Sequence, residues 1–322
     1  MPGLTTTEIH NVALVGKGYV GGYVYDKLVD AGFNVTLLSR SNPDNKVNVR
    51  VVDYGSTKSL TEALEGQDAV VSTISMAGWP HQYKLIDAAV AVGTVKHFIP
   101  SDFTALSTNP HVADLPFYRD AVGIQDYLRK KAENADMKWT IIQTGPIIGC
   151  VLNGAYAYNF RDRTALHVGD ERNSGHKVSM TRGYTIGKAV VSVLSKTKEM
   201  ESGPVHIHDV VTSQQEILEI AQKKSGTKWS ISHVDAEAKL QEGLGMFEAA
   251  GKEPPPIFAT FLVIHYTIFG GKYKTDWDGE GNKALGISTL SKEEWEDLIA
   301  QRVRNEPIDG GLPWNSAPKP RK

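Results

Sequence analysis

The chain has few of the features that mark secreted, membrane or nucleic-acid-binding proteins. One cysteine among 322 residues permits no internal disulfide, which suits a reducing compartment. The 35 Lys and Arg nearly balance 37 Asp and Glu, so a net charge of −2 gives no general attraction to nucleic acid or an anionic membrane. No run approaches the roughly 18 apolar residues that span a bilayer, and the polar residues 1–10 do not resemble a signal peptide. We therefore expect a cytoplasmic protein without nucleic-acid or membrane partners.

The sequence also lacks the residue clusters of metal centres and hydrolases. The ten histidines are scattered, and His206 with His208 on one face of an expected strand would need further ligands to hold a metal. Cys150 has no identified triad partners, and no Gly-x-Ser-x-Gly motif occurs. We predict no metal site.

What the sequence does contain is a regular alternation of short apolar runs and amphipathic segments in its first half. Apolar strands separated by helices are typical of a parallel sheet covered on both faces, and right-handed crossovers favour the doubly wound strand order. We predict an α/β fold with a Rossmann domain over residues 8–150. The expected strands are Val12–Val15, Val35–Leu38, Val47–Asp53, Ala69–Thr73, Val95–Ile99 and Trp139–Gln143.

The helical signals are less regular. Ser59 and Glu62 have the spacing of a capping box, and a further helix is expected from about Ala121 to Ala135. The alternation is lost after Gly149, and we predict a smaller substrate-binding region over 151–317 that closes over the carboxyl edge of the sheet. In this region we expect helices at Ile186–Leu194 and Gln214–Lys224, a strand at Val205–Val211, and irregular helix over 243–269.

A glycine-rich loop, Gly16-Lys17-Gly18-Tyr19-Val20-Gly21, follows the first expected strand and opens the first helix. In a dinucleotide-binding turn the first glycine permits the tight turn, the second lets the backbone approach the pyrophosphate, and the third lets the helix pack on the strand. The helix N-terminus then offers free N–H groups to the phosphate oxygens. The alternative is a turn that is glycine-rich by chance.

The second expected strand ends in Ser39-Arg40. An acidic residue at this place would bind the ribose 2′-hydroxyl and select NAD, whereas an arginine suits a 2′-phosphate. Lys46 follows closely and could add a second positive charge. We predict NADPH as the cofactor, the alternative being that Arg40 is an ordinary surface residue.

Four motifs together resemble one protein family. They are the glycine loop, His97-Phe98-Ile99-Pro100-Ser101-Asp102-Phe103, Thr144-Gly145-Pro146 and Ile186-Gly187-Lys188. Over about residues 10–220 the chain resembles the isoflavone reductase-like and NmrA-like proteins, atypical short-chain dehydrogenases that include phenylcoumaran benzylic ether reductases. The resemblance implies that Thr73, Ile74 and Ser101 line the nicotinamide side, and that Met76 and Phe103 border the substrate. Core packing is the alternative for Met76 and Phe103.

The chain departs from the plant reductases where those carry a lysine and, four residues later, an arginine. By our count these positions are Ala121 and Gln125, so the family's proton donor is missing. Tyr118 and Asp120 are the replacement donors that we consider, against an ordinary helix start with Asp120 as N-cap. Tyr127 and Lys131 mimic a YxxxK pair but come one to two turns too late.

These observations favour an NADPH-dependent reductase of a small aromatic or polyketide-like molecule. Two other functions stay open: a non-redox isomerase or cyclase on the same scaffold, and a dinucleotide-sensing regulator of the NmrA-like kind. The sequence also leaves a homodimer open.

Overall fold

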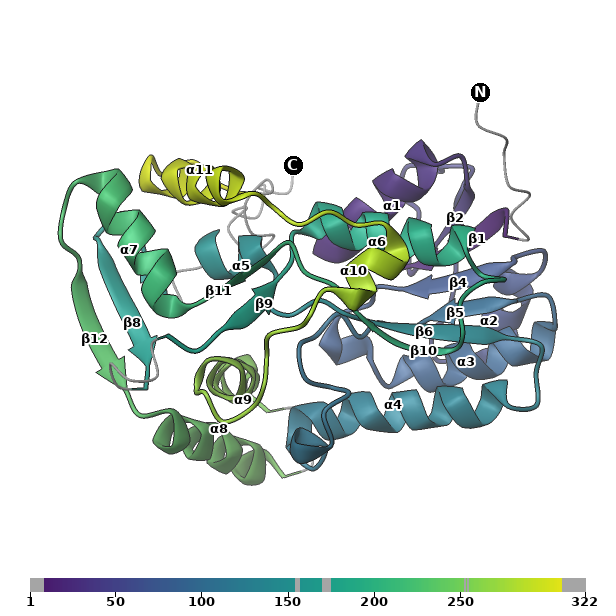
Figure 1. The fold of residues 1–322 in the computed structure, drawn as a ribbon. Helices are drawn as coiled ribbons and strands as arrows, with labels where there is room; N and C mark the ends of the chain where they lie inside the picture. The colour runs from purple at the N-terminus through teal and green to yellow at the C-terminus, as the bar shows by residue number, and fades with distance from the viewer. Residues whose placement is uncertain (1–8, 154–156, 170–174, 252, 254, 309–322) are drawn as a thin grey trace.

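The computed structural model describes residues 9–153, 157–169, 175–251, 253 and 255–308 (Figure 1). The outer bounds that we expected for the two regions, residues 8 and 317, lie outside the described residues. Within these ranges no helix has both the length and the apolar character needed to cross a membrane.

A seven-stranded sheet in the order β10-β6-β5-β4-β1-β2-β3 forms the centre of the fold. Every neighbouring pair in it is parallel. The strand order reverses between β1 and β4, which confirms the doubly wound Rossmann prediction. The strands are β1 (Asn11–Val15), β2 (Asn34–Ser39), β3 (Val49–Val51), β4 (Ala69–Ser72), β5 (His97–Ile99), β6 (Lys138–Gln143) and β10 (Gly203–His206).

Helices cover both faces of this sheet (Figure 1). α1 (Tyr19–Asp30) and α6 (Gly183–Ser195) pack together on one face, and α2 (Thr57–Leu64), α3 (His81–Val92) and α4 (Pro116–Ala132) pack in sequence on the other. Side chains of β1 pack on both faces of the sheet. Val12 and Leu14 belong to one apolar cluster, and Ala13 and Val15 belong to the other. This explains why the strand is apolar throughout.

The α1–α6 contact accounts for one motif of the family resemblance. A Cβ atom on Gly187 would lie 2.6 Å from the Tyr23 carbonyl oxygen, and one on Gly183 would lie 2.4 Å from the Tyr23 ring. Glycine at these positions lets the two helices approach closely. Ile186-Gly187-Lys188 is therefore a packing motif in this chain.

The later part of the chain surrounds one end of the sheet (Figure 1). It contains a two-stranded sheet of β9 and β11 and a three-stranded sheet in the order β12-β8-β7. Because α6 and β10 return to the main sheet, the chain after residue 150 is not a separate unit. The remaining elements are α5 (Ile148–Asn153), β7 (Tyr158–Asn159), β8 (Thr164–Val168), β9 (Val178–Met180), β11 (Val210–Thr212), α7 (Gln214–Ser225), β12 (Ser230–Val234), α8 (Ala236–Ala250), α9 (Ile257–Phe269), α10 (Glu280–Leu285) and α11 (Lys292–Val303).

The single strand expected at Val205–Val211 was wrong. β10 ends at His206, and β11 pairs antiparallel with β9 in another sheet. Between them the buried Asp209 carboxylate accepts hydrogen bonds from the Arg182 backbone N–H (2.7 Å) and the Thr185 hydroxyl (2.9 Å). These bonds turn the chain away from the sheet. His206 and His208 are consequently not on one strand face.

Two helix starts also differ from expectation. Ser56, not Ser59, caps α2, because its side chain accepts a hydrogen bond from the Ser59 N–H at 3.2 Å. α4 begins at Pro116, five residues before the expected start. Proline suits the first helical position, where its missing N–H costs nothing. The N-cap of α4 is Leu115, so Asp120 is not the N-cap residue.

Candidate active site

The three glycines of the loop after β1 have three different surroundings. Gly16 has a φ of +90°, a conformation that favours glycine. A Cβ atom on Gly21 would lie 2.5 Å from both the Gly16 carbonyl oxygen and Thr73 Oγ1, so only glycine allows this packing. Around Gly18 nothing lies within 4 Å of such an atom. Gly18 is thus the exposed position that a pyrophosphate can approach, with the first-turn N–H groups of α1 behind it.

Two basic residues, Arg40 and Lys46, follow β2, where the adenosine end of a dinucleotide would lie. Arg40 is exposed, and its charge partly offsets the burial that raises the pKa of the Tyr54 hydroxyl, which places the two side chains near each other. Lys46 forms an exposed ion pair with Asp44 at 3.0 Å. Sequence reasoning did not single out the side chain of Lys17, whose ammonium lies 3.5 Å from the Tyr25 ring centroid.

The residues expected at the nicotinamide lie together at the carboxyl ends of β4 and β5. The Thr73 hydroxyl donates to the Gly16 carbonyl at 2.7 Å, and the Ser101 hydroxyl donates to the Ile74 carbonyl at 2.7 Å. The first bond ties the end of β4 to the glycine loop, and the second ties the end of β5 to the end of β4. Gln82 braces the group because its Oε1 accepts the Ser101 N–H at 2.7 Å. Nothing in the sequence distinguished Gln82 from other polar residues of a covering helix.

Met76 and Phe103 differ in their surroundings. Met76 begins a short 3-10 helix, η1 (Met76–Gly78), and its side chain is 36% exposed, so core packing does not explain it. Phe103 is half-buried and packs against the apolar cluster under α1 and α6. Each lies four residues beyond the end of a strand at the carboxyl edge, β4 for Met76 and β5 for Phe103. A substrate-contacting role therefore fits Met76 better than Phe103.

The structure places both candidate proton donors poorly. Tyr118 is 1% exposed, its hydroxyl lies 2.8 Å from Thr267 Oγ1 of α9, and burial raises its pKa. Asp120 is exposed on α4, and its charge adds to the burial that raises the pKa of the Tyr83 hydroxyl on α3. Burial also raises the pKa of Asp120, and Arg119 partly offsets this. Tyr118 points into the core and Asp120 toward a neighbouring helix.

The other positions on α4 have clear structural roles. Tyr127 donates to Asp87 Oδ1 at 2.7 Å and Lys131 pairs with the same carboxylate at 2.6 Å, so this pair joins α4 to α3. Ala121 is buried in the core. Gln125 instead reaches the carboxyl end of β5, where its Nε2 donates to Asp102 Oδ2 at 2.5 Å. Of the two positions that we matched to the family lysine and arginine, only Gln125 lies beside the candidate site.

A lysine at position 121 is expected to destabilise the protein rather than supply a proton. Ala121 is 2% exposed, and a buried ammonium without a partner lowers the free energy of unfolding by about 3 kcal/mol or more. Chemical denaturation of Ala121→Lys measures this loss. Gln125→Lys is the matched control, because its ammonium can pair with Asp102, and a smaller loss is expected. Equal stability of wild type and Ala121→Lys would contradict the argument.

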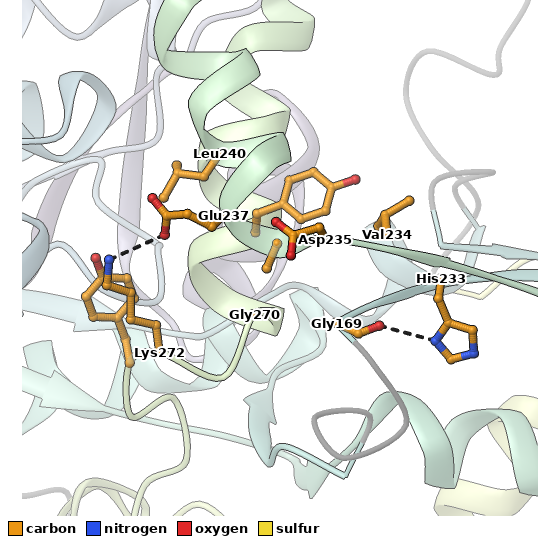
Figure 2. A pocket seen from close by; sticks show the side chains of 11 residues that line it. Gly169, His233, Val234, Asp235, Glu237, Leu240, Gly270 and Lys272 are labelled. Carbon is orange, nitrogen blue, oxygen red and sulfur yellow. Dashed lines mark hydrogen bonds and ion pairs between the residues drawn. The ribbon is translucent and has the colours of Figure 1, made fainter.

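A cavity of about 420 Å³ lies elsewhere, between the end of β12, the start of α8 and the end of α9 (Figure 2). Lys272 and Glu237 pair across it at 3.5 Å, and the His233 ring contacts the Gly169 carbonyl at 3.2 Å. No residue of the glycine loop or of the β4 and β5 ends lines this cavity. It is therefore separate from the candidate dinucleotide site. Within the described ranges, no three His, Cys, Asp or Glu side chains gather as a metal site would need.

Comparison with known proteins now places the chain. The model of the NmrA-like family matches residues 10–252. The chain belongs to the NmrA-like family. This match confirms the family resemblance that began with the glycine loop.

Several proteins similar to this chain are oxidoreductases or reductases by name. The chain is 29% identical to "Oxidoreductase aprR" of Aspergillus flavus, over 88% of this chain and 96% of the relative. The leucoanthocyanidin reductase–NADPH complex from Vitis vinifera superimposes with a TM-score of 0.68 at 19% identity, covering 91% of this chain and 99% of that one. The NADPH complex of a quinone oxidoreductase from Escherichia coli gives 0.66 at 18% identity, with the same coverage. These structures share the fold.

Proposed function

We propose that this NmrA-like protein is an NADPH-dependent reductase of a small aromatic or polyketide-like molecule. The observation that carries the proposal is the order of groups along the carboxyl edge of the sheet. Arg40 follows β2, the glycine loop follows β1, and Thr73 and Ser101 follow β4 and β5. This order matches a dinucleotide lying across the switch point. The reductase names of relatives and neighbours support the same function.

The site fits NADPH by its shape and charge. Gly18 leaves open space before the α1 N-terminus, and the Gly21 packing keeps the loop tight against β4. The backbone from Gly16 to Gly21, including Tyr19 and Val20, would hold the pyrophosphate, and Arg40 with Lys46 would hold the 2′-phosphate. Thr73, Ile74 and Ser101 would orient the nicotinamide, with Met76 and Phe103 toward the substrate. When bound, NADPH supplies the hydride.

The test of the function is NADPH oxidation with a panel of aromatic enones and quinones, followed by absorbance and product analysis. Turnover of NADPH coupled to a reduced product is expected. Binding of NADPH without its oxidation, while a substrate is isomerised or cyclised, would instead support the non-redox enzyme. Binding without any product would support the dinucleotide sensor.

Arg40→Ala is expected to weaken NADPH binding by about 10–100-fold, because a charge-assisted contact with phosphate contributes about 1.5–3 kcal/mol. NADH lacks the 2′-phosphate, so its affinity is expected to stay within about twofold. Fluorescence titration of both cofactors against both proteins measures this. Arg50→Ala, at an exposed arginine whose guanidinium bonds the Ala63 carbonyl at 2.7 Å, is the control. Equal wild-type affinities for NADPH and NADH would overturn the assignment.

A further inference from the structure

A buried carboxyl group lies beside the residues expected at the nicotinamide. Asp102 directly follows Ser101 at the carboxyl end of β5, and its side chain is 3% exposed. The mechanism proposed above does not use it. The side chains that hydrogen-bond to it are those of Thr104, Ser107, Gln125 and Gln143.

All four hydrogen-bonding neighbours of Asp102 are uncharged. They come from the loop after β5, from α4 and from β6, and no cation contributes to the environment of the carboxyl in the described part of the chain. The ionisable group that faces it is the Tyr118 hydroxyl of α4. A carboxylate buried without a cation is costly, so burial favours the neutral acid. Burial accordingly raises the pKa of Asp102, and the hydrogen bonds that these four side chains donate to it offset this only in part.

The hydrogen-bond network accommodates the neutral acid. Gln125 Nε2 donates to Oδ2 of Asp102 at 2.5 Å, and Ser107 Oγ can donate to the same oxygen at 2.9 Å while it accepts from Gln143 Nε2 at 2.7 Å. The Thr104 hydroxyl donates to Oδ1 at 2.8 Å when Asp102 is a carboxylate; when Oδ1 carries a proton, the same contact reverses and Oδ1 donates to Thr104 Oγ1. A hydroxyl proton rotates, so this contact serves in either direction. Thr104 is left with a hydroxyl proton for another acceptor.

Thr104 bridges the strand ends where a substrate would lie. Its carbonyl oxygen accepts the backbone N–H groups of Thr144 (2.8 Å) and Gly145 (3.1 Å), which follow β6. Its side chain is half-buried, unlike that of Asp102, and it comes directly after Phe103. In a doubly wound sheet, ligands bind outside the carboxyl ends of the strands. Thr104 therefore connects the buried acid to the candidate substrate space.

We propose that Asp102 supplies the proton of the reduction through the hydroxyl group of Thr104. The inference rests on the proposed reductase function. The substrate carbon accepts a hydride, with its electron pair, from NADPH. The π bond of the reduced double bond breaks, and its electron pair takes the proton of the Thr104 hydroxyl, whose O–H bond breaks. Thr104 takes the Asp102 proton, and Asp102 is left as a carboxylate. After product release, water returns one proton to Asp102, so each turnover consumes one NADPH and one proton.

The first test compares two probe substrates in single-turnover NADPH oxidation. Reduction of 1,4-naphthoquinone gives a stable anion and needs little proton donation, whereas reduction of chalcone needs a donor. Asp102→Asn and Thr104→Val are expected to slow chalcone reduction by about 10²–10⁴-fold, and naphthoquinone reduction by less than about tenfold. Thr104→Ser keeps the hydroxyl and is expected to keep most of the chalcone rate. Tyr118→Phe and Asp120→Asn are controls that should leave the ratio of the two rates unchanged.

The pH dependence distinguishes proton donation from structural support. The wild-type chalcone rate is expected to fall as pH rises through the Asp102 pKa, since only the acid form donates. Asp102→Asn and Thr104→Val are expected to lose this dependence, with NADPH affinity retained. An unchanged pH profile in either variant would overturn the proposal, as would equal slowing of both probes.

A second readout needs no substrate. The infrared difference between wild type and Asp102→Asn at pH 7 is expected to show the C=O stretch of a protonated carboxyl group, with Asp120→Asn as the control. A carboxylate band in its place would overturn the proposal. If wild type oxidises NADPH with neither probe, the reductase function fails, while the infrared result still decides whether Asp102 is a stored acid.

Discussion

Gly18→Val is expected to abolish NADPH binding while the protein stays folded. No atom lies within 4 Å of a Cβ placed on Gly18, so the free energy of unfolding should change by less than about 1 kcal/mol. The side chain would instead fill the space in which the pyrophosphate approaches the backbone. We expect affinity to fall by at least about 100-fold, or about 2.7 kcal/mol. Calorimetric titration with NADPH and thermal denaturation measure the two quantities.

Gly21→Val is the matched comparison. It changes the same loop, but at a position where a side chain is expected to reduce the stability of the protein as well as NADPH binding. Its Cβ would lie 2.5 Å from the Gly16 carbonyl oxygen and from Thr73 Oγ1. Such overpacking costs about 1–3 kcal/mol or more, so stability and binding should fall together. Undiminished NADPH binding by Gly18→Val would show that the loop does not hold the phosphates.

The protein is expected to lose stability on acidification through His97. This imidazole is fully buried between Thr140 Oγ1 (2.9 Å from Nε2) and Thr197 Oγ1 (3.3 Å from Nδ1), and burial, with a smaller effect of Lys138, lowers its pKa from 6.5 to about 3. Between pH 6.5 and about 3, His97 is therefore protonated in the unfolded chain and neutral in the folded one. The contribution of His97 is fully present above pH 6.5 and is lost progressively down to pH 3. At pH 4.5 the loss is about 2.7 kcal/mol.

Denaturant unfolding at several pH values tests this expectation. His97→Gln should be less stable at pH 7, because it repacks the site, but its stability should depend less on pH between 6.5 and 4.5. His265 is also buried with a pKa lowered to about 3, and burial lowers the pKa of four further histidines, so part of the histidine effect should remain in this variant. His111→Gln changes an exposed side chain and serves as the control. Equal slopes for wild type and His97→Gln would contradict the assignment.

The sequence predicted best what short-range chemistry determines. Strand β1 is apolar at four successive buried positions, and the glycine spacing that follows it is typical of a dinucleotide-binding turn, so both could be placed from the sequence alone. The first residue of α4 could not be predicted in this way, because Pro116 allows an earlier helix start than the apolar periodicity indicates. Such starts depend on a single cap residue.

Long-range pairing accounts for what the sequence did not predict. β10 pairs with β6 across about 60 residues. The buried Asp209 after β10 accepts hydrogen bonds from Arg182, the N-cap of α6, and from Thr185 within α6. The sequence placed Asp102 in a family motif but did not predict its buried hydrogen-bond network, because its partners Gln125 and Gln143 are 23 and 41 positions away. Local periodicity contains no information about such contacts. The donor candidates Tyr118 and Asp120 were chosen by proximity in sequence, which does not determine which way a helical side chain points.

Two elements from the second half of the chain, α6 and β10, complete the sheet formed by the first half, and this has a consequence for biosynthesis. Edge strand β10 and the covering helix α6 come from residues 183–206, so a nascent chain that has emerged only to residue 150 exposes the apolar face of α1 and an unpaired β6 edge. Unpaired edges and exposed apolar faces are sites of aggregation. Folding during translation must therefore wait for about fifty further residues, which take several seconds at about 5–20 residues per second. Over that interval the sheet lacks its edge strand β10 and its covering helix α6, and we expect a chaperone that binds apolar segments to bind it.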